Sequence, residues 1–189
     1  MTKKEIRAVY KQKRLQLSSS EVAYFHKRIA AQLKDCILPT AKIVLSYHPI
    51  LSSNEINTKP FEVIIQSKIP NIKFVYPKLT NTKGNMEAVL ETNNTSYQSN
   101  AWKIPEAISR KTINTLQIDI ILLPLLAMDK KGYRVGYGKG YYDQFIQRCK
   151  PNVYCIGFSY FEPIEKITDA SSFDVPLQLG VTPNCVYEF

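Results

Sequence analysis

The sequence predicts a single-domain α/β protein of three layers, α/β/α, in which helices cover both faces of a mostly parallel central sheet. Three observations lead to this prediction. Short β-branched runs alternate with amphipathic helical patterns, which is the order expected of a parallel α/β sheet. Residues 118–124 are nearly all apolar, as in a strand covered on both faces. The 189 residues, 44% of them hydrophobic, are enough for one compact core, so we expect one domain over residues 1–189.

The N-terminal part of the chain predicts two helices and a strand. Residues 3–17 carry apolar side chains at helical spacing among lysines and arginines, which indicates a basic amphipathic helix. A serine run followed by Glu21 resembles a capping box and opens a second helix over residues 18–34. The β-branched run 42–47, bounded by prolines, predicts the first strand.

The middle of the chain is more polar. Residues 55–67 favour a helix, with Pro60 in its first turn. Residues 73–76 and 86–90 predict two strands joined by an asparagine-rich turn. The segment 91–113 is rich in Asn, Thr and Ser, and we expect it to be the longest loop.

The C-terminal half returns to the alternating pattern. The apolar run 118–124 predicts a central strand, and residues 141–149 predict a helix. A second buried strand is expected over residues 153–158, and a final strand or edge segment over residues 181–189.

Cysteine usage and the N-terminus bear on location. The four cysteines lie far apart without a CxxC pair, and only two histidines could join them as soft metal ligands. We therefore expect free thiols in a reducing compartment. The first residues have no apolar signal-peptide core, so a cytoplasmic protein is expected. The longest apolar run, residues 120–128, is about half the ~20 residues of a membrane-spanning helix, so no membrane association is expected.

The formal net charge of +9 predicts attraction of anions. Nucleic acids, nucleotides and polyanionic metabolites would all satisfy this field, so charge alone does not identify the ligand. A noncatalytic nucleic-acid-binding module is one alternative. The basic residues are dispersed beyond the first helix, and the twelve tyrosines form no RNA-recognition motif, which counts against that alternative.

The segment 132–143 carries the most chemical information. Four of the seven glycines lie there, after the predicted central strand and before a predicted helix. Glycines allow close approach of a ligand to the backbone, and a helix start directs N–H groups at an anion. With Arg134 and Lys139 the segment predicts a phosphate-binding loop, and Asp143 offers a hard oxygen for Mg²⁺. It is neither a Walker A loop nor a Rossmann fingerprint, and the simpler alternative is a solvent-exposed glycine turn.

Residues 123–129, Leu-Pro-Leu-Leu-Ala-Met-Asp, followed by Gly-Tyr-Arg-Val-Gly-Tyr-Gly-Lys-Gly-Tyr-Tyr-Asp, are similar to the signature of 5-formyltetrahydrofolate cyclo-ligases, also called methenyltetrahydrofolate synthetases. Leu125 stands where that family usually has glycine, and Met128 where it usually has phenylalanine. Further similarity lies in Lys-Lys-Glu-Ile-Arg at 3–7, Glu-Ile-Asn-Thr at 55–58, and the Asp-Val-Pro-Leu and Val-Thr-Pro elements near the C-terminus. The resemblance therefore covers nearly the whole chain.

The resemblance implies a set of site residues. For ATP the set is Lys3, Lys4, Arg7, Arg134, Gly136, Tyr137, Gly138, Lys139, Gly140, Tyr141 and Tyr142. For the folate it is Arg7, Leu45, Glu55, Tyr137, Gly138, Lys139, Gly140 and Tyr141. Asp143 and Asp174 would coordinate Mg²⁺, and Arg134 and Lys139 would be catalytic by neutralising phosphate charge. Each position has a simpler explanation as well: surface charge for Lys3 and Arg7, strand core for Leu45, and helix-dipole contact for Glu55.

The resemblance also implies a ligase reaction in which 5-formyltetrahydrofolate and ATP give 5,10-methenyltetrahydrofolate, ADP and phosphate. Transfer of the γ-phosphoryl group to the formyl oxygen would activate the formyl carbon for attack by N10. This needs no enzyme nucleophile, and the sequence shows no persuasive Ser/His/Asp or Cys/His set. A related enzyme that uses ATP to activate another carboxamide or carboxylate is the nearest alternative.

The expected partners are small molecules. Natural folates can carry polyglutamate tails, which a basic surface would attract, whereas no nucleic-acid or membrane partner is expected. The sequence leaves the oligomeric state open, with a monomer favoured, and assigns no role to Trp102 or His48.

Overall fold

The computed structural model describes residues 1–80, 82, 84–92, 95–100, 104–108 and 111–189. Its helices are α1 (Lys3–Leu15), α2 (Ser19–Asp35), α3 (Lys59–Lys68) and α4 (Tyr141–Ile146), with the 3-10 helices η1 (Leu51–Ser53) and η2 (Thr115–Gln117). Its strands are β1 (Ile43–Leu45), β2 (Lys73–Leu79), β3 (Met86–Leu90), β4 (Tyr97–Ser99), β5 (Pro105–Ala107), β6 (Thr112–Ile113), β7 (Ile120–Leu123), β8 (Ala127–Met128), β9 (Arg134–Val135), β10 (Tyr154–Phe158), β11 (Leu179–Val181) and β12 (Val186–Glu188).

The main sheet of the described residues has the strand order β12-β11-β10-β7-β1-β2-β3-β6. The five strands from β11 to β2 are parallel, and β12, β3 and β6 pair antiparallel at the two sides. The α/β class with a mostly parallel sheet is thus confirmed. The final segment 181–189 forms two strands: Val181 ends β11, the Thr182 hydroxyl accepts from the Cys185 N–H at 3.0 Å, and β12 returns beside β11.

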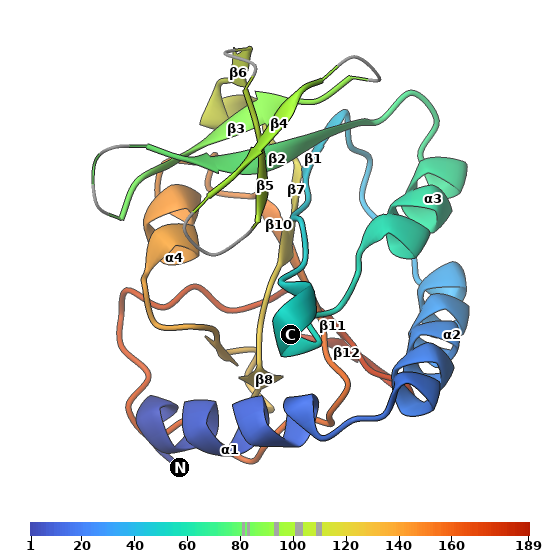
Figure 1. The fold of residues 1–189 in the computed structure, drawn as a ribbon, viewed down its shortest axis with the longest axis vertical. Helices are drawn as coiled ribbons and strands as arrows, with labels where there is room; N and C mark the ends of the chain where they lie inside the picture. The colour runs from blue at the N-terminus through green and yellow to red at the C-terminus, as the bar shows by residue number, and fades with distance from the viewer. Residues whose placement is uncertain (81, 83, 93–94, 101–103, 109–110) are drawn as a thin grey trace.

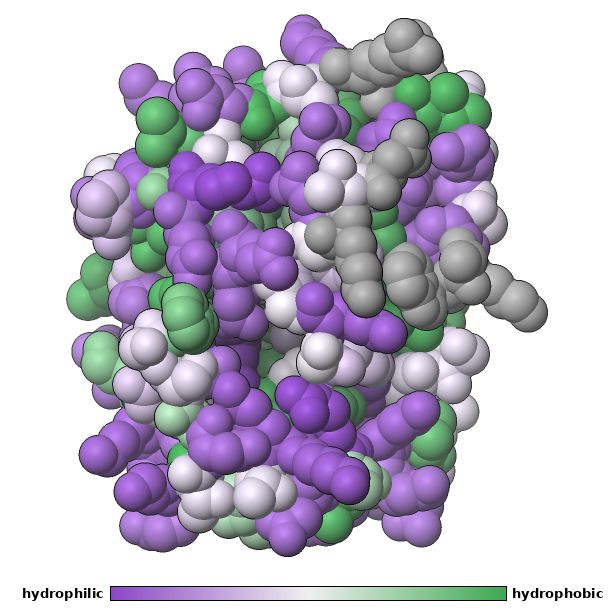
Figure 2. Space-filling view, turned by 90° about the vertical axis from the view of Figure 1, so that its left-hand side faces the viewer, coloured by the Kyte–Doolittle hydropathy of each residue, from purple (hydrophilic) through white to green (hydrophobic). Residues whose placement is uncertain are grey.

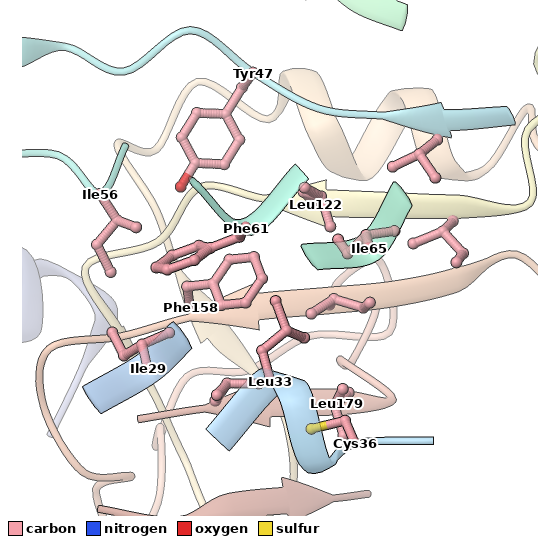
Figure 3. Packing of buried hydrophobic residues seen from close by; sticks show 14 of the residues in the cluster. Ile29, Leu33, Cys36, Tyr47, Ile56, Phe61, Ile65, Leu122, Phe158 and Leu179 are labelled. Carbon is pink, nitrogen blue, oxygen red and sulfur yellow. The ribbon is translucent and has the colours of Figure 1, made fainter. Parts of the chain in front are cut away.

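The helices cover both faces of the sheet, because alternate strand residues point to opposite sides. On one face, residues of α2 and α3 form a core cluster with Val44, Leu122 and Phe158. Figure 3 shows Phe61 of α3 beside Phe158, with ring centroids 4.6 Å apart. On the other face, residues of α4 pack against Leu45 and Leu123, which follow Val44 and Leu122 in their strands. Figure 1 shows α4 on one side of the sheet and α2 and α3 on the other, which confirms the three layers.

Helix α1 lies across the carboxyl ends of the parallel strands, beside the small hairpin β8–β9 (Figure 1). Ile6 and Tyr10 of α1 form a third core cluster with residues of this hairpin. The buried Asp129 carboxylate holds the hairpin in place, because it accepts from the N–H groups of Lys131 at 2.9 Å, Tyr133 at 3.0 Å and Ile167 at 3.0 Å. Its second strand, β9, belongs to residues 132–143, which we call the glycine segment.

Two expectations for the middle of the chain were wrong in their bounds. Helix α3 begins at Lys59 rather than at residue 55, and the buried Thr58 precedes it with its hydroxyl donating to the Glu62 carboxylate at 3.1 Å. The predicted loop 91–113 contains the short strands β4, β5 and β6, and β6 extends the main sheet. Trp102 lies outside the described residues. Strands of two or three residues form only through pairing with distant partners, so local sequence does not reveal them.

No helix among the described residues is long and apolar enough to span a membrane.

Candidate active site

A cavity of about 670 Å³ lies beyond the carboxyl ends of β1, β2 and β7, which is where parallel α/β sheets commonly bind ligands. Its wall is built from α1, the segment after β1, the β2–β3 hairpin, the glycine segment and Asp174. Figure 2 shows hydrophilic side chains over much of this face, including its lower part, the end at which α1 lies in Figure 1.

The cavity brings together most of the residues predicted from sequence. Those that line it are Lys3, Arg7, Glu55, Arg134, Gly136, Tyr137, Gly138, Lys139, Gly140, Tyr141, Tyr142, Asp143 and Asp174. Lys4 and Leu45 do not line it. Lys4 is exposed, because adjacent helix residues point about 100° apart and Lys3 takes the inward position. The fully buried Leu45 side chain packs in the core on the α4 face of the sheet.

Near its end, the glycine segment takes a backbone conformation that favours glycine at residues 138 and 140. Gly138 and Gly140 have φ angles of +82° and +72°, in the left-handed region. A Cβ atom on Gly138 would lie 2.9 Å from Cζ of Arg7. The Arg7 Nε group in turn donates to the Gly136 carbonyl at 3.0 Å. Helix α1 and the glycine segment therefore contact each other closely here, and a side chain at residue 138 would require the Arg7 guanidinium to move.

Basic groups and backbone donors meet where this segment ends. Gly140 is the N-cap of α4, and no side chain caps the helix there. The first-turn N–H groups of a helix have no intrahelical acceptor. Lys139 is exposed and lines the cavity together with Lys3, Arg7 and Lys11 of α1. This end of the cavity can therefore bind a phosphorylated ligand.

Arg134 and Lys3 hold the two carboxylates of this end. The buried Arg134 guanidinium donates to Asp143 Oδ1 at 2.8 Å and to the Val175 carbonyl at 2.5 Å. Lys3 Nζ donates to Asp174 Oδ1 at 2.6 Å and Oδ2 at 2.5 Å. Burial alone would raise the pKa of Asp174, but the hydrogen bonds from Lys3 and Ser171 outweigh it and hold the pKa below its ordinary value. Asp174 is thus ionised at neutral pH.

The donor set suits a metal that is shared with a ligand. Among the described residues, no group of three or more His, Cys, Asp or Glu side chains could hold an ion by itself. Asp143 and Asp174 both line the cavity, and Arg134 links them because it contacts Asp143 and the residue after Asp174. Mg²⁺ commonly takes one or two carboxylates and completes its shell with substrate phosphates and water. The pair therefore fits Mg²⁺ that arrives with a nucleotide.

A buried polar group lies at another part of the wall. The Glu55 Oε2 atom accepts from the Ile50 N–H at 2.8 Å, whereas its buried Oε1 atom has no hydrogen-bond partner. Burial raises the pKa of Glu55, although the Ile50 N–H, the Arg14 charge and the Tyr137 hydroxyl act in the opposite direction. Burial also raises the pKa of Tyr137 to about 12, with Glu55 as a further cause, so the phenol is neutral. Glu55 therefore presents an acceptor to the cavity.

The remaining wall is largely apolar or aromatic and was not predicted from sequence. Its residues are Lys11, Tyr47, His48, Ile50, Ser52, Ser53, Pro77, Leu79, Met86, Asn100, Ile104, Glu106 and Pro124. His48 stacks on Tyr76, with centroids 4.6 Å apart and ring planes at 15°, and its Nε2 lies 2.9 Å from Glu91 Oε1. Lys11 could have been found, because it follows Arg7 by one helical turn. The others are brought together only by the strand order.

Comparisons with known proteins show which family this chain resembles. The model of the 5-formyltetrahydrofolate cyclo-ligase family matches residues 1–177. A 5-formyltetrahydrofolate cyclo-ligase from Mycoplasma pneumoniae is 30% identical over 182 residues, 95% of this chain and 97% of the relative. One from Mycoplasma genitalium is 25% identical over 178 residues, 93% of this chain and 95% of the relative. The NMR structure of Aquifex aeolicus 5,10-methenyltetrahydrofolate synthetase has a TM-score of 0.78 at 27% identity and covers all of this chain and 93% of its own. The structure of a 5,10-methenyltetrahydrofolate synthetase from Mycoplasma pneumoniae has a TM-score of 0.75 at 27% identity, with 97% and 99% covered.

Proposed function

Because the chain belongs to the 5-formyltetrahydrofolate cyclo-ligase family, we propose that it converts 5-formyltetrahydrofolate and ATP into 5,10-methenyltetrahydrofolate, ADP and phosphate, with Mg²⁺ as cofactor. The observation that carries this proposal is a single cavity in which a basic glycine segment and a buried carboxylate face the same space. A phosphorylated nucleotide and a pteridine ring need these two features side by side.

The basic end of the cavity would bind the ATP phosphates. Lys139, Lys3 and Arg7 supply positive charge, and the backbone of the glycine segment supplies N–H donors close to the ligand. Arg134 also lines the cavity, and its hydrogen bonds go to Asp143 and to the Val175 carbonyl. We assign Arg134 the role of holding Asp143 toward the nucleotide.

Asp143 and Asp174 would hold Mg²⁺ against the phosphates. When bound, the ion neutralises charge on the transferred phosphoryl group. In this arrangement Lys3 would keep Asp174 ionised and oriented until the nucleotide arrives.

Glu55 would anchor the folate. A reduced pteridine ring carries N–H donors, and the unpartnered Oε1 atom of Glu55 is a buried acceptor that such a donor satisfies. Tyr47, Ile50 and Leu79 would pack on the ring, as in most small-molecule sites with an apolar wall. Arg7 lines the cavity and contacts the glycine segment, and it would orient the reacting groups.

The chemistry then needs positioning rather than an enzyme nucleophile. The formyl oxygen takes the γ-phosphoryl group of ATP and ADP leaves. N10 attacks the formyl carbon, the carbon–oxygen bond breaks to release phosphate, and the released phosphate takes up the N10 proton. The wall keeps the two ligands aligned and excludes water, which is how phosphoryl-transfer sites supply most of their rate enhancement.

The first test follows the absorbance of the methenyl product after 5-formyltetrahydrofolate is added to purified protein. Three mixtures are compared: MgATP, ATP with a metal chelator, and no ATP. We expect a rise with MgATP alone. A rise without ATP would refute the mechanism, and no rise from folded protein that binds ATP would favour a relative acting on another carboxamide or carboxylate.

The cellular compartment and the form of the folate are part of the same proposal. The thiols of Cys36, Cys149, Cys155 and Cys185 are free, which supports a reducing compartment such as the cytoplasm. The net charge of +9 supports attraction of folates with polyglutamate tails. Affinity that rises with tail length at low salt would support this point, and affinity independent of tail length would remove it.

A further inference from the structure

Two buried side-chain atoms of the described residues lack a hydrogen-bond partner: Nε of Arg14 and Oε1 of Glu55. Both belong to charged residues on the two sides of Tyr137. Unsatisfied buried charged groups are costly, and in native proteins they call for a specific explanation. Glu55 lines the cavity, so a ligand can satisfy it. Arg14 does not line the cavity and is only 2% exposed, so its explanation must be different.

Arg14 connects three parts of the wall. Its Nη2 group donates to the Tyr137 hydroxyl, and its Nη1 group donates to the Leu125 carbonyl at 3.3 Å. Its own carbonyl accepts from Asn54 Nδ2 at 3.1 Å, and Asn54 directly precedes Glu55. Arg14 follows Arg7 by seven residues, which is two helical turns. Helix α1 therefore holds the glycine segment with two arginines, at Gly136 and at Tyr137.

Arg14 is also the cation that acts on Glu55. Its charge lowers the pKa of Glu55, against the burial that raises it. The other groups that interact with Glu55 are the phenols of Tyr47, Tyr137, Tyr142 and Tyr160, whose pKa values burial raises, so they remain neutral at physiological pH. The described residues contain no ion pair to Glu55. The negative charge of Glu55 is therefore offset mainly by the positive charge of Arg14.

We propose that Arg14 is a positioning residue that keeps Glu55 ionised and Tyr137 oriented, so that Glu55 accepts hydrogen bonds from the pteridine ring. This inference rests on the proposed function, because it assigns the role of Glu55 to folate binding. Arg14 itself touches no ligand and acts through Glu55 and Tyr137.

The test is the pH dependence of kcat/KM for 5-formyltetrahydrofolate in Arg14→Met, Arg14→Lys and a matched control, Lys13→Met. Lys13 is an exposed cation one residue away on the same helix. We expect the acid limb of Arg14→Met to move up by about one pH unit, which is about a tenfold loss below the limb. Arg14→Lys restores the charge and should bring the pH of the acid limb most of the way back to the wild-type value. Lys13→Met should not change the pH of the acid limb. In Glu55→Gln the limb disappears, and adding Arg14→Met then moves nothing.

A second measurement tests the effect of Arg14 on the ionisation of Glu55 without relying on turnover. In protein labelled with ¹³C at the glutamate carboxyl, the Glu55 signal is identified by its loss in Glu55→Gln. We expect its titration midpoint to be about one unit higher in Arg14→Met than in the wild type. An unchanged midpoint, or a loss of activity equal at all pH values, would overturn the inference and leave Arg14 a structural residue. Absence of turnover in the wild type would refute the proposed function instead, while the carboxyl titration would still decide the link between Arg14 and Glu55.

Discussion

Replacing Gly138 by alanine tests the fit between α1 and the glycine segment. At φ +82° a residue with a side chain is strained by about 1–2 kcal/mol. The new Cβ atom would also lie 2.9 Å from Cζ of Arg7, so the guanidinium must move and lose its hydrogen bond to the Gly136 carbonyl. A hydrogen bond from a charged donor contributes about 1.5–3 kcal/mol.

The two effects in Gly138→Ala together come to about 3 kcal/mol, which corresponds to about a 100-fold loss in kcat/KM if the loop must regain its shape around the ligands. The assay is initial-rate formation of the methenyl product at varied ATP and varied folate, with thermal unfolding measured in parallel. Because we assign Arg7 to both ATP and the folate, both KM values should rise.

Gly84→Ala is the control for backbone strain. Gly84 has a φ of +81° and does not line the cavity, and its added Cβ would meet only the flexible end of Gln144 at 2.9 Å. This variant should lose about 1–2 kcal/mol of stability and keep its activity. If Gly138→Ala stayed within about threefold of the wild type, or if both variants lost activity equally, the close contact with Arg7 would not matter for function.

Three further predictions concern single side chains. Asp143→Ala should reduce kcat by about 100-fold or more and raise the Mg²⁺ concentration needed, with a cooperative unfolding transition retained; near-normal Mg²⁺-dependent turnover would rule out its role as a ligand. Lys139→Ala should raise KM for ATP by about tenfold and leave KM for the folate within about threefold; unchanged ATP dependence would argue against the phosphate contact. The His26 ring shares a hydrogen bond of 2.8 Å with the Tyr160 hydroxyl, and burial lowers the pKa of His26. Neutral His26 therefore contributes fully to folding stability above the unfolded pKa of about 6.5, and this contribution decreases as the pH falls below that value. Urea unfolding at pH 7.5 and 5.5 should therefore show a pH-dependent loss of up to about 1 kcal/mol that His26→Gln lacks, and equal losses in the two proteins would contradict this cause.

Local patterns in the sequence were sufficient for the helices and the longer strands, although not for every boundary. The N-caps of α1 and α2 are capping boxes, formed with Glu5 and Glu21, so both helices begin where short-range hydrogen bonds dictate. The apolar run of β7 is buried at all four residues, as its composition predicts. The start of α3 was wrong because a buried network of Ser46, Thr58 and Glu62 sets it, and Ser46 belongs to a distant segment.

The candidate site likewise contains residues that the sequence predicted and residues that only the structure revealed. The glycine segment was found because its residues are adjacent in sequence, and the left-handed angles of Gly138 and Gly140 are local requirements. Arg14 was not found, because nothing in its neighbourhood on α1 indicates that Tyr137, 123 residues away, receives its hydrogen bond. Leu45 was proposed as a folate contact, but the pleat of β1 turns its side chain into the core.

The order of residues was enough to predict the three-layer class, the central strands, and a glycine segment with basic residues and a carboxylate, which we propose to bind phosphate. These features depend on periodicity and on neighbours within a few positions, which the order of residues records directly. The folded structure was needed to show which side chains share the cavity, that Asp174 pairs with Lys3, and that Arg14 donates to the Tyr137 hydroxyl. These contacts join segments more than a hundred residues apart, or groups placed by strand order, and they are specified by packing across the sheet rather than by any local pattern.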